Sequence, residues 1–200
     1  MHGSNSSTAK LTATVGTCIA LGSFVLFAIL NRVGVLPITF GVRMVETWSM
    51  FLFVVLWATR MEGLSLSSLG FKRPTAGTVG WALVAVISIY VFFGIYYRMI
   101  APLFGGVVTP SAVGEIASQP PYQIVILSLS AGIVEELVFR FYPISRLHWL
   151  TGNRWLASII PMIVFVSLHL PRFGLAQVIP VTFRDGGVYT ALLAQARTLL

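Results

Sequence analysis

The sequence predicts an all-α protein, a polytopic membrane helix bundle with five to six transmembrane helices. Three observations lead to this prediction. Only 10% of the 200 residues are charged, and 56% are hydrophobic. Soluble domains carry about 25% charged residues, more than twice the fraction found here. Mean hydropathy is +0.88, which also indicates that lipid is the solvent of this chain. The chain also contains several uncharged stretches, each about 20 residues long, which is the length that a helix needs to cross a bilayer.

These uncharged stretches locate the predicted spans. Four are long enough to cross the hydrocarbon core, namely Leu11–Asn31, Pro74–Tyr97, Ile116–Val134 and Trp155–Pro171. A fifth, about Val45–Thr59, is shorter, so we expect it to tilt or to reach the headgroups at its ends. The region 173–200 is apolar but interrupted by Arg184 and Asp185, which leaves a sixth span open.

The chain is expected to form one membrane domain over residues 11–200. Residues 1–10 are polar and are expected to form a disordered tail. The apolar run that follows is longer than a signal-peptide core and lacks a small-residue cleavage pattern, so we interpret it as a retained helix. Cys18 is the only cysteine, which excludes an internal disulfide and a thiolate metal site.

A net charge of +7 and a pI near 10.2 would suit a nucleic-acid partner, but the basic residues form no single face. They concentrate in two connections between spans, whereas the connection 99–119 has none. The two basic groups are Arg60, Lys72 and Arg73, and Arg146 and Arg154. Positive charge is typical of cytoplasmic loops. We therefore predict a multi-pass integral membrane protein with a cytoplasmic N-terminus, a lipid bilayer as its partner and no nucleic acid.

The stretch GIVEELVFRFYP, residues 132–143, places charge inside an apolar region. Glu136 and Arg140 are four residues apart, so they share a helix face and are expected to pair. Glu135 points about 100° away from Glu136 and has no such partner in its own helix. An ionisable group within a span costs at least ~2.5–3.5 kcal/mol on insertion scales, so Glu135 needs a partner elsewhere.

The predicted partner of Glu135 is His169 in the next span. With a turn near Thr151–Gly152, both residues lie roughly 25 Å along antiparallel helices, hence at nearly the same depth. Phe165 and His169, in FVSLH, share one helix face. A carboxylate in such a site can accept a proton from water near neutral pH, while the imidazole orients the water or passes the proton on.

A metal is the alternative, with Glu135 and His169 as ligands. A catalytic zinc site usually has three protein ligands, and the sequence has no H-E-x-x-H motif. We therefore predict no cofactor, and a divalent metal such as zinc stays the alternative.

EELVFR, residues 135–140, followed about 25 residues later by FVSLH, resembles the EExxxR and FxxxH motifs of the CPBP family. This family comprises membrane-embedded CAAX proteases and bacteriocin-processing enzymes, also called Abi proteins. The likeness covers about residues 63–200, with a family-like core at about 116–200. It implies that Glu135 and His169 activate the hydrolytic water, with Glu136, Arg140 and Phe165 in support. The implied substrate is a peptide or protein, such as a prenylated C-terminus or a leader peptide.

The resemblance also implies a third motif in a later span, a histidine with an asparagine or aspartate four residues on. The sequence has no histidine after His169 and no asparagine after Asn153. We therefore expect an incomplete C-terminal end, as in a fragment, an altered C-terminus or a degenerate paralogue. Two functions stay open. One is an intramembrane peptidase; the other is a noncatalytic membrane protein, such as an immunity factor, whose Glu-Glu-Arg/His cluster is structural.

Overall fold

The computed structural model describes residues 3–37, 39–104, 118–174 and 178, and every regular element within them is helical. The predicted all-α class is confirmed for this part of the chain. Its residues form two compact units, residues 1–71 with 120–168 (unit 1) and residues 72–119 with 169–200 (unit 2). Among the described residues, three helices are long and apolar enough to cross a membrane, namely Ser6–Arg32, Phe40–Met61 and Arg154–Pro171.

Helix α1, Gly3–Arg32, is longer than the first predicted span. The residues assigned to a disordered tail are helical from Gly3 onward. Once the apolar part has paid for nucleation, each further residue adds a backbone hydrogen bond, so the helix extends into the polar stretch. Two threonine hydroxyls in this helix donate to backbone carbonyls one turn earlier. Thr12 donates to the carbonyl of Thr8 at 3.0 Å, and Thr14 to that of Lys10 at 2.8 Å.

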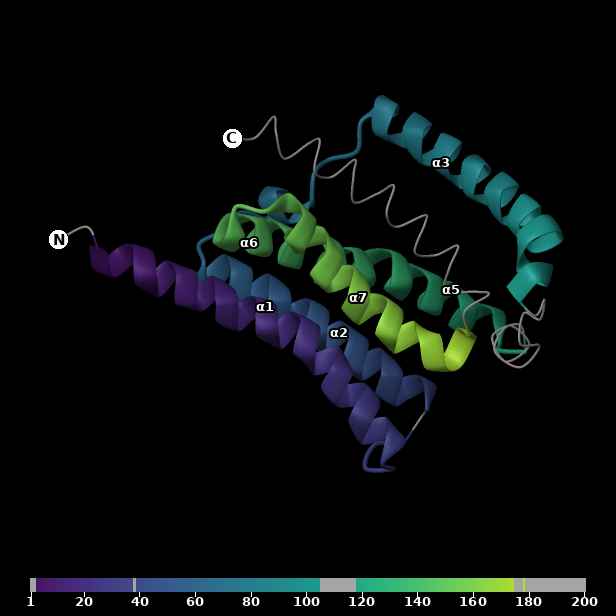
Figure 1. Cartoon of the computed structure of the whole chain (residues 1–200), viewed down its shortest axis with the longest axis horizontal. Helices are drawn as coiled ribbons and strands as arrows, with labels where there is room; N and C mark the ends of the chain where they lie inside the picture. The colour runs from purple at the N-terminus through teal and green to yellow at the C-terminus, as the bar shows by residue number, and fades with distance from the viewer. Residues whose placement is uncertain (1–2, 38, 105–117, 175–177, 179–200) are drawn as a thin grey trace. The chain divides into compact units, whose positions relative to one another are not determined.

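Helix α2, Phe40–Leu56, continues as a π-helix, η1, over Trp57–Met61. Its first turn is capped by Thr39, whose hydroxyl accepts from the amide of Val42 at 3.3 Å. It packs beside α1, where the hydroxyl of Ser23 lies 2.8 Å from the sulfur of Met50 (Figure 1). The helix ends at Glu62, and a short 3₁₀ turn, η2, follows at Leu66–Leu69.

The fourth predicted span overlaps the first part of a longer helix, here called the motif helix. It comprises α5, Pro121–Ser130, the π-helix η5, Ala131–Phe141, and α6, Tyr142–Thr151. Pro121 occupies the first helical position, where a missing N–H is harmless. The helix ends at Gly152, whose φ of 66° is the left-handed conformation that favours glycine. The predicted turn is thereby confirmed.

Helix α7, Arg154–Phe173, begins directly after that turn and runs back along the motif helix (Figure 1). The Asn153 side chain caps it by accepting from the amide of Trp155 at 2.9 Å and that of Leu156 at 3.2 Å. Most of the predicted region 173–200 lies outside the described residues.

Unit 2 contains the third predicted span as helix α3, Ala76–Ile95. Thr75 precedes it and accepts from the amide of Thr78 at 3.1 Å. A π-helix, η3, follows at Tyr96–Ile100, and a 3₁₀ turn, η4, at Ala101–Phe104.

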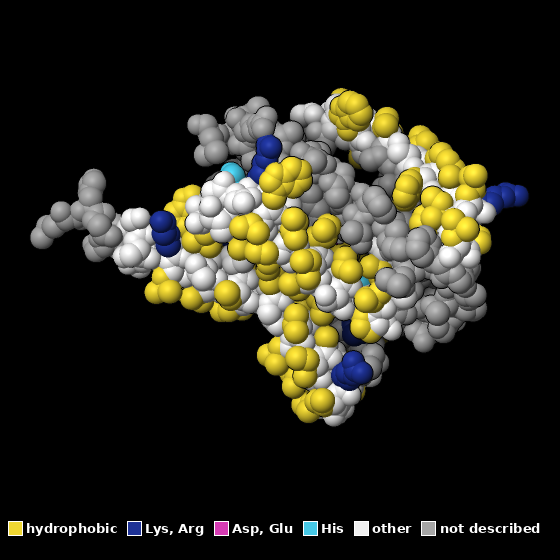
Figure 2. Space-filling view, in the orientation of Figure 1, with side chains coloured by type: hydrophobic (Ala, Val, Ile, Leu, Met, Phe, Trp, Pro, Cys, Tyr) yellow, Lys and Arg dark blue, Asp and Glu magenta, His cyan; other side chains and the backbone are white. Residues whose placement is uncertain are grey.

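Large apolar side chains are exposed along the described helices. Figure 2 shows them spread over the visible described surface, with few basic side chains between them. The exposed fraction reaches 65% at Leu11 on α1, 71% at Val45 on α2 and 56% at Ile163 on α7. Soluble monomers rarely expose apolar surface on this scale, and hydrocarbon is the solvent that suits it. These are the features of a membrane protein.

Candidate active site

The two acidic residues and the arginine of the EELVFR motif all lie on η5. The sequence predicts an α-helix here, with hydrogen bonds four residues apart. The structure instead winds eleven residues as a π-helix, with hydrogen bonds five residues apart. Such winding is rare, usually occupies a single turn and is frequent at functional sites. The motif therefore stands on the least regular part of its helix.

Glu136 and Arg140 form the predicted ion pair within η5. The Arg140 side chain is only 3% exposed, whereas that of Glu136 is 34% exposed. The guanidinium carbon of Arg140 also lies 5.7 Å from the centre of the Phe165 ring, a cation–π distance. The buried Arg140 guanidinium thus contacts the Glu136 carboxylate and the face of the Phe165 ring.

Phe139 joins three helices at the level of the motif. It is buried, and its ring centroid lies 5.0 Å from that of Phe24 on α1 and 5.3 Å from that of Phe165 on α7. Aromatic pairs at this separation favour offset or edge-on packing, which fixes the rings relative to one another. The contact between Phe139 and Phe165 therefore sets the level at which α7 meets η5.

Glu135 and His169 lie on these same two helices. Glu135 is half-buried on η5, and His169 follows Phe165 by four residues on α7, hence on the same face. His169 belongs to the part of α7 that falls in unit 2. The convergence of the two side chains on one water stays a prediction.

Within the described residues, no group of three or more His, Cys, Asp or Glu side chains is arranged to hold a metal ion. The sequence-level alternative of a zinc site with Glu135 and His169 therefore gains no third ligand among these side chains.

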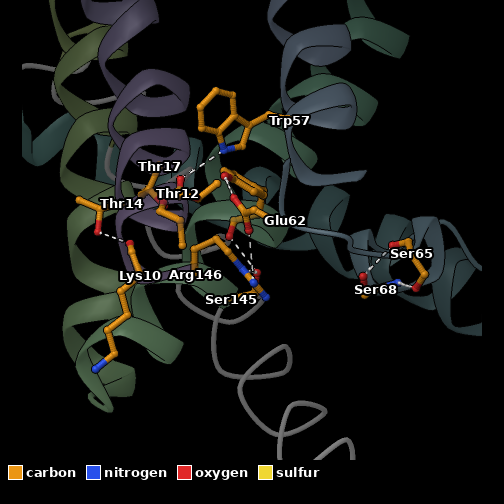
Figure 3. A network of polar contacts seen from close by, with 12 residues as sticks. Lys10, Thr12, Thr14, Thr17, Trp57, Glu62, Ser65, Ser68, Ser145 and Arg146 are labelled. Atoms are coloured by element: carbon orange, nitrogen blue, oxygen red, sulfur yellow. Dashed lines mark hydrogen bonds and ion pairs between the residues drawn. The ribbon is translucent and has the colours of Figure 1, made fainter. Parts of the chain in front are cut away.

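Sequence reasoning missed a second polar cluster, formed by Glu62, Tyr142 and Arg146 and here called the Glu62 cluster. The Tyr142 hydroxyl donates to Glu62 Oε1 at 2.5 Å, and Arg146 Nη1 lies 3.3 Å from Glu62 Oε2. Figure 3 shows the Glu62 carboxylate directed toward Arg146. The Glu62 side chain is only 5% exposed, so this buried carboxylate depends on its protein partners rather than on water.

The sequence-based assignment of Arg146 changes as a result. Glu62 is not among the candidate residues of the sequence analysis, and Arg146 is assigned there to a basic connection, yet Arg146 lies on α6 and pairs with Glu62. Arg146 therefore contributes less to the cytoplasmic charge bias than its sequence position suggests. The small number of acidic residues could have drawn attention to Glu62. The chain has only six, and each one near a span needs a partner.

The Glu62 cluster is packed against α1 at its closest approach. A Cβ at Gly16 would overlap both the phenol oxygen of Tyr142 and the indole nitrogen of Trp57. Trp57 donates to the carbonyl of Thr12 at 3.3 Å. Glycine at position 16 thus allows α1 to lie against both aromatic side chains.

Residues 117–200 match the family model of the Rce1-like type II CAAX prenyl endopeptidases. The family predicted from the two motifs is confirmed for this part of the chain. The match includes the motif helix and α7, and so both EELVFR and FVSLH. No curated protein and no solved structure matches the chain.

Proposed function

We propose that this CAAX-protease-type chain is an intramembrane peptidase that hydrolyses a peptide bond with a water activated by Glu135 and His169. The observation that carries the proposal is the contact between Phe139 and Phe165, which sets the level of α7 against η5. The two helices run in opposite directions because the turn at Gly152 joins them.

The contact supports a common level for the two proposed catalytic residues. Glu135 precedes Phe139 by four residues, and His169 follows Phe165 by four, so both steps lead away from the turn at Gly152. On α7 the step advances about 6 Å, and on the wider η5 somewhat less. Counted along the chain, Glu135 and His169 are thus equally far from Gly152, which supports the proposed pairing.

The chemistry follows from the two groups. The Glu135 carboxylate takes a proton from the water as the water oxygen attacks the carbonyl carbon of the scissile bond. The C–N bond then breaks, the proton passes to the leaving nitrogen, and the products are a carboxylic acid and an amine. His169 orients the water or relays the proton. Arg140 pairs with Glu136 on the same helix.

The proposed substrate is a peptide whose scissile bond lies close to a prenylated C-terminus. The matched family is described as prenyl endopeptidases. A prenyl chain buries about 0.8 kcal/mol per CH₂ in the bilayer, which concentrates such a peptide where the exposed apolar helices lie. A leader peptide is the alternative, and it would be cleaved equally well without a lipid.

The test is turnover of a quenched fluorescent peptide, with and without a farnesyl group, by the purified chain in lipid nanodiscs. Glu135→Gln and His169→Ala should each lower the rate by ~10²–10⁴, because each removes a proton-handling group. Glu46→Gln is the matched control, since it makes the same acid-to-amide change on α2 and should leave the rate unchanged. Turnover should also persist after dialysis against a chelator.

Several results would contradict the proposal. Glu135→Gln that cleaves at the wild-type rate would exclude Glu135 as the base. A rate lost to the chelator and restored by zinc would favour the metal alternative. A folded wild-type chain without turnover would favour the noncatalytic alternative, in which the contacts of Arg140 and Phe165 only hold helices together.

A further inference from the structure

The π-helix η5 is held at both of its ends by a single neighbouring helix. That neighbour is the continuous helix formed by α2 and η1, over Phe40–Met61. One anchor lies at the residue directly before η5, and the other at the residue directly after it. Both anchors belong to unit 1.

The first anchor is Ser130, the last residue of α5. Its hydroxyl accepts from the indole N–H of Trp48 at 3.0 Å and lies 3.6 Å from the sulfur of Met44. Ser130 is buried, and Trp48 and Met44 lie one turn apart on the same face of α2. The N-terminal end of η5 is therefore fixed to one position along α2.

The second anchor is Tyr142, the first residue of α6. Its hydroxyl donates to Glu62, the residue that ends η1. Arg146, one turn further along α6, contacts the other oxygen of the same carboxylate. The C-terminal end of η5 is therefore fixed to the C-terminal end of η1.

Two fixed ends determine how the residues between them are wound. From Ser130 to Tyr142 an α-helix would advance about 18 Å, whereas a π-helix has more residues per turn and advances less. Releasing one end would allow η5 to rewind toward the α-helical form. That change would rotate Glu135 relative to both ends, and so relative to α7.

We propose that Glu62 and Tyr142 are positioning residues that keep η5 in its π-wound form and thereby aim Glu135. Ser130 and Trp48 hold the opposite end. The catalytic part of this inference rests on the proposed function, whereas the effect on winding does not. In this proposal Glu62 acts through the winding of η5 and has no direct role in the reaction.

The test measures two quantities on the purified chain in nanodiscs. The first is backbone amide hydrogen exchange across residues 131–141, which needs no catalysis. The second is kcat and KM for the fluorescent peptide. Tyr142→Phe removes only the donated hydroxyl, and Glu62→Gln keeps the shape while removing the charge. Trp57→Phe is the control, because it removes a hydrogen bond from η1 to α1 and none to α6.

Tyr142→Phe and Glu62→Gln should each raise exchange in residues 131–141 about tenfold, the change expected when one hydrogen bond to a charged group is lost. The value of kcat should fall by a similar factor while KM stays unchanged, because Glu135 is misaligned but the substrate still binds. Trp57→Phe should leave exchange in this segment and kcat at their wild-type values.

The outcomes separate this inference from the proposed function. Unchanged exchange in residues 131–141 for both variants would overturn the inference, even if the wild type cleaves peptide. An equal rise in exchange throughout unit 1, or the same rise with Trp57→Phe, would also overturn it, since that result indicates general destabilisation. Raised exchange confined to residues 131–141 in a chain without turnover would uphold the anchoring and overturn the peptidase.

Discussion

The motif helix carries two ion pairs that differ in how they are made. Glu136 and Arg140 pair within η5, four residues apart. Glu62 and Arg146 are 84 residues apart and join the end of η1 to α6. In the first pair the cation is the more buried partner, at 3% exposed, and in the second it is the carboxylate, at 5% exposed.

The difference shows which partner controls the stability of each pair. Removing the more exposed partner of a pair leaves the more buried charge uncompensated, and that is the costly direction. For the local pair the costly change is therefore at Glu136, and for the long-range pair it is at Arg146. In the long-range pair, the uncharged Tyr142 hydroxyl also donates a hydrogen bond to the Glu62 carboxylate.

The largest expected effect tests the local pair. Glu136→Gln should lower the free energy of unfolding by about 3 kcal/mol, because it removes the Glu136 carboxylate from the buried Arg140 guanidinium. The measurement is reversible unfolding in mixed detergent micelles, followed by tryptophan fluorescence. Glu136→Gln combined with Arg140→Gln should recover part of the loss. A loss below that of an exposed helical pair, about 0.5 kcal/mol, would show that Arg140 is stabilised by its other contacts alone.

The next effect tests the packing that surrounds the long-range pair. Gly16→Ala should lower the free energy of unfolding by about 1–3 kcal/mol, because its methyl group would overlap Tyr142 and Trp57 in a packed site. Gly22→Ala is the matched control on the same helix, where a Cβ meets nothing within 4 Å. The control should be neutral or slightly stabilising, since alanine is the better helix former. Equal behaviour of the two variants would contradict the close approach of α1 at Gly16.

The smallest effect tests the coupling across the long-range pair itself. A double-mutant cycle with Glu62→Gln and Arg146→Gln should give a coupling energy of about 1 kcal/mol, because a 3.3 Å ion pair near the end of the bundle is partly solvated. The same unfolding assay measures it. A coupling energy near zero would mean that Tyr142 alone holds Glu62 in place.

Local patterns account for what could be predicted of the fold and the site. Uncharged stretches predicted the helices α1, α2, α3 and α7. The turn near Gly152 predicted where the motif helix ends, and this end is confirmed. The spacing of Glu136 and Arg140 predicted their pairing. Each of these features depends on residues within a few turns of one another, so it can be predicted from the local sequence alone.

Other features depend on contacts between distant segments. The π winding of η5 has no local signature, and the sequence predicted an α-helix there, because a helical pattern does not report where the ends of a segment are held. The partner of Glu62 could not be predicted either, since any of several basic residues could have met it. Residues 3–10 were expected to be disordered from their polarity, yet they extend α1.

The sequence by itself thus determined the solvent, the helices, the turn at Gly152 and the two family motifs, because burial in lipid and helix periodicity act through composition and short-range order. Only the tertiary structure decided that Phe139 lies between Phe24 and Phe165, and that Glu62 meets Tyr142 and Arg146. Those contacts arise when helices far apart in the sequence pack side by side. Their energies depend on distance in space, which the order of residues does not encode locally.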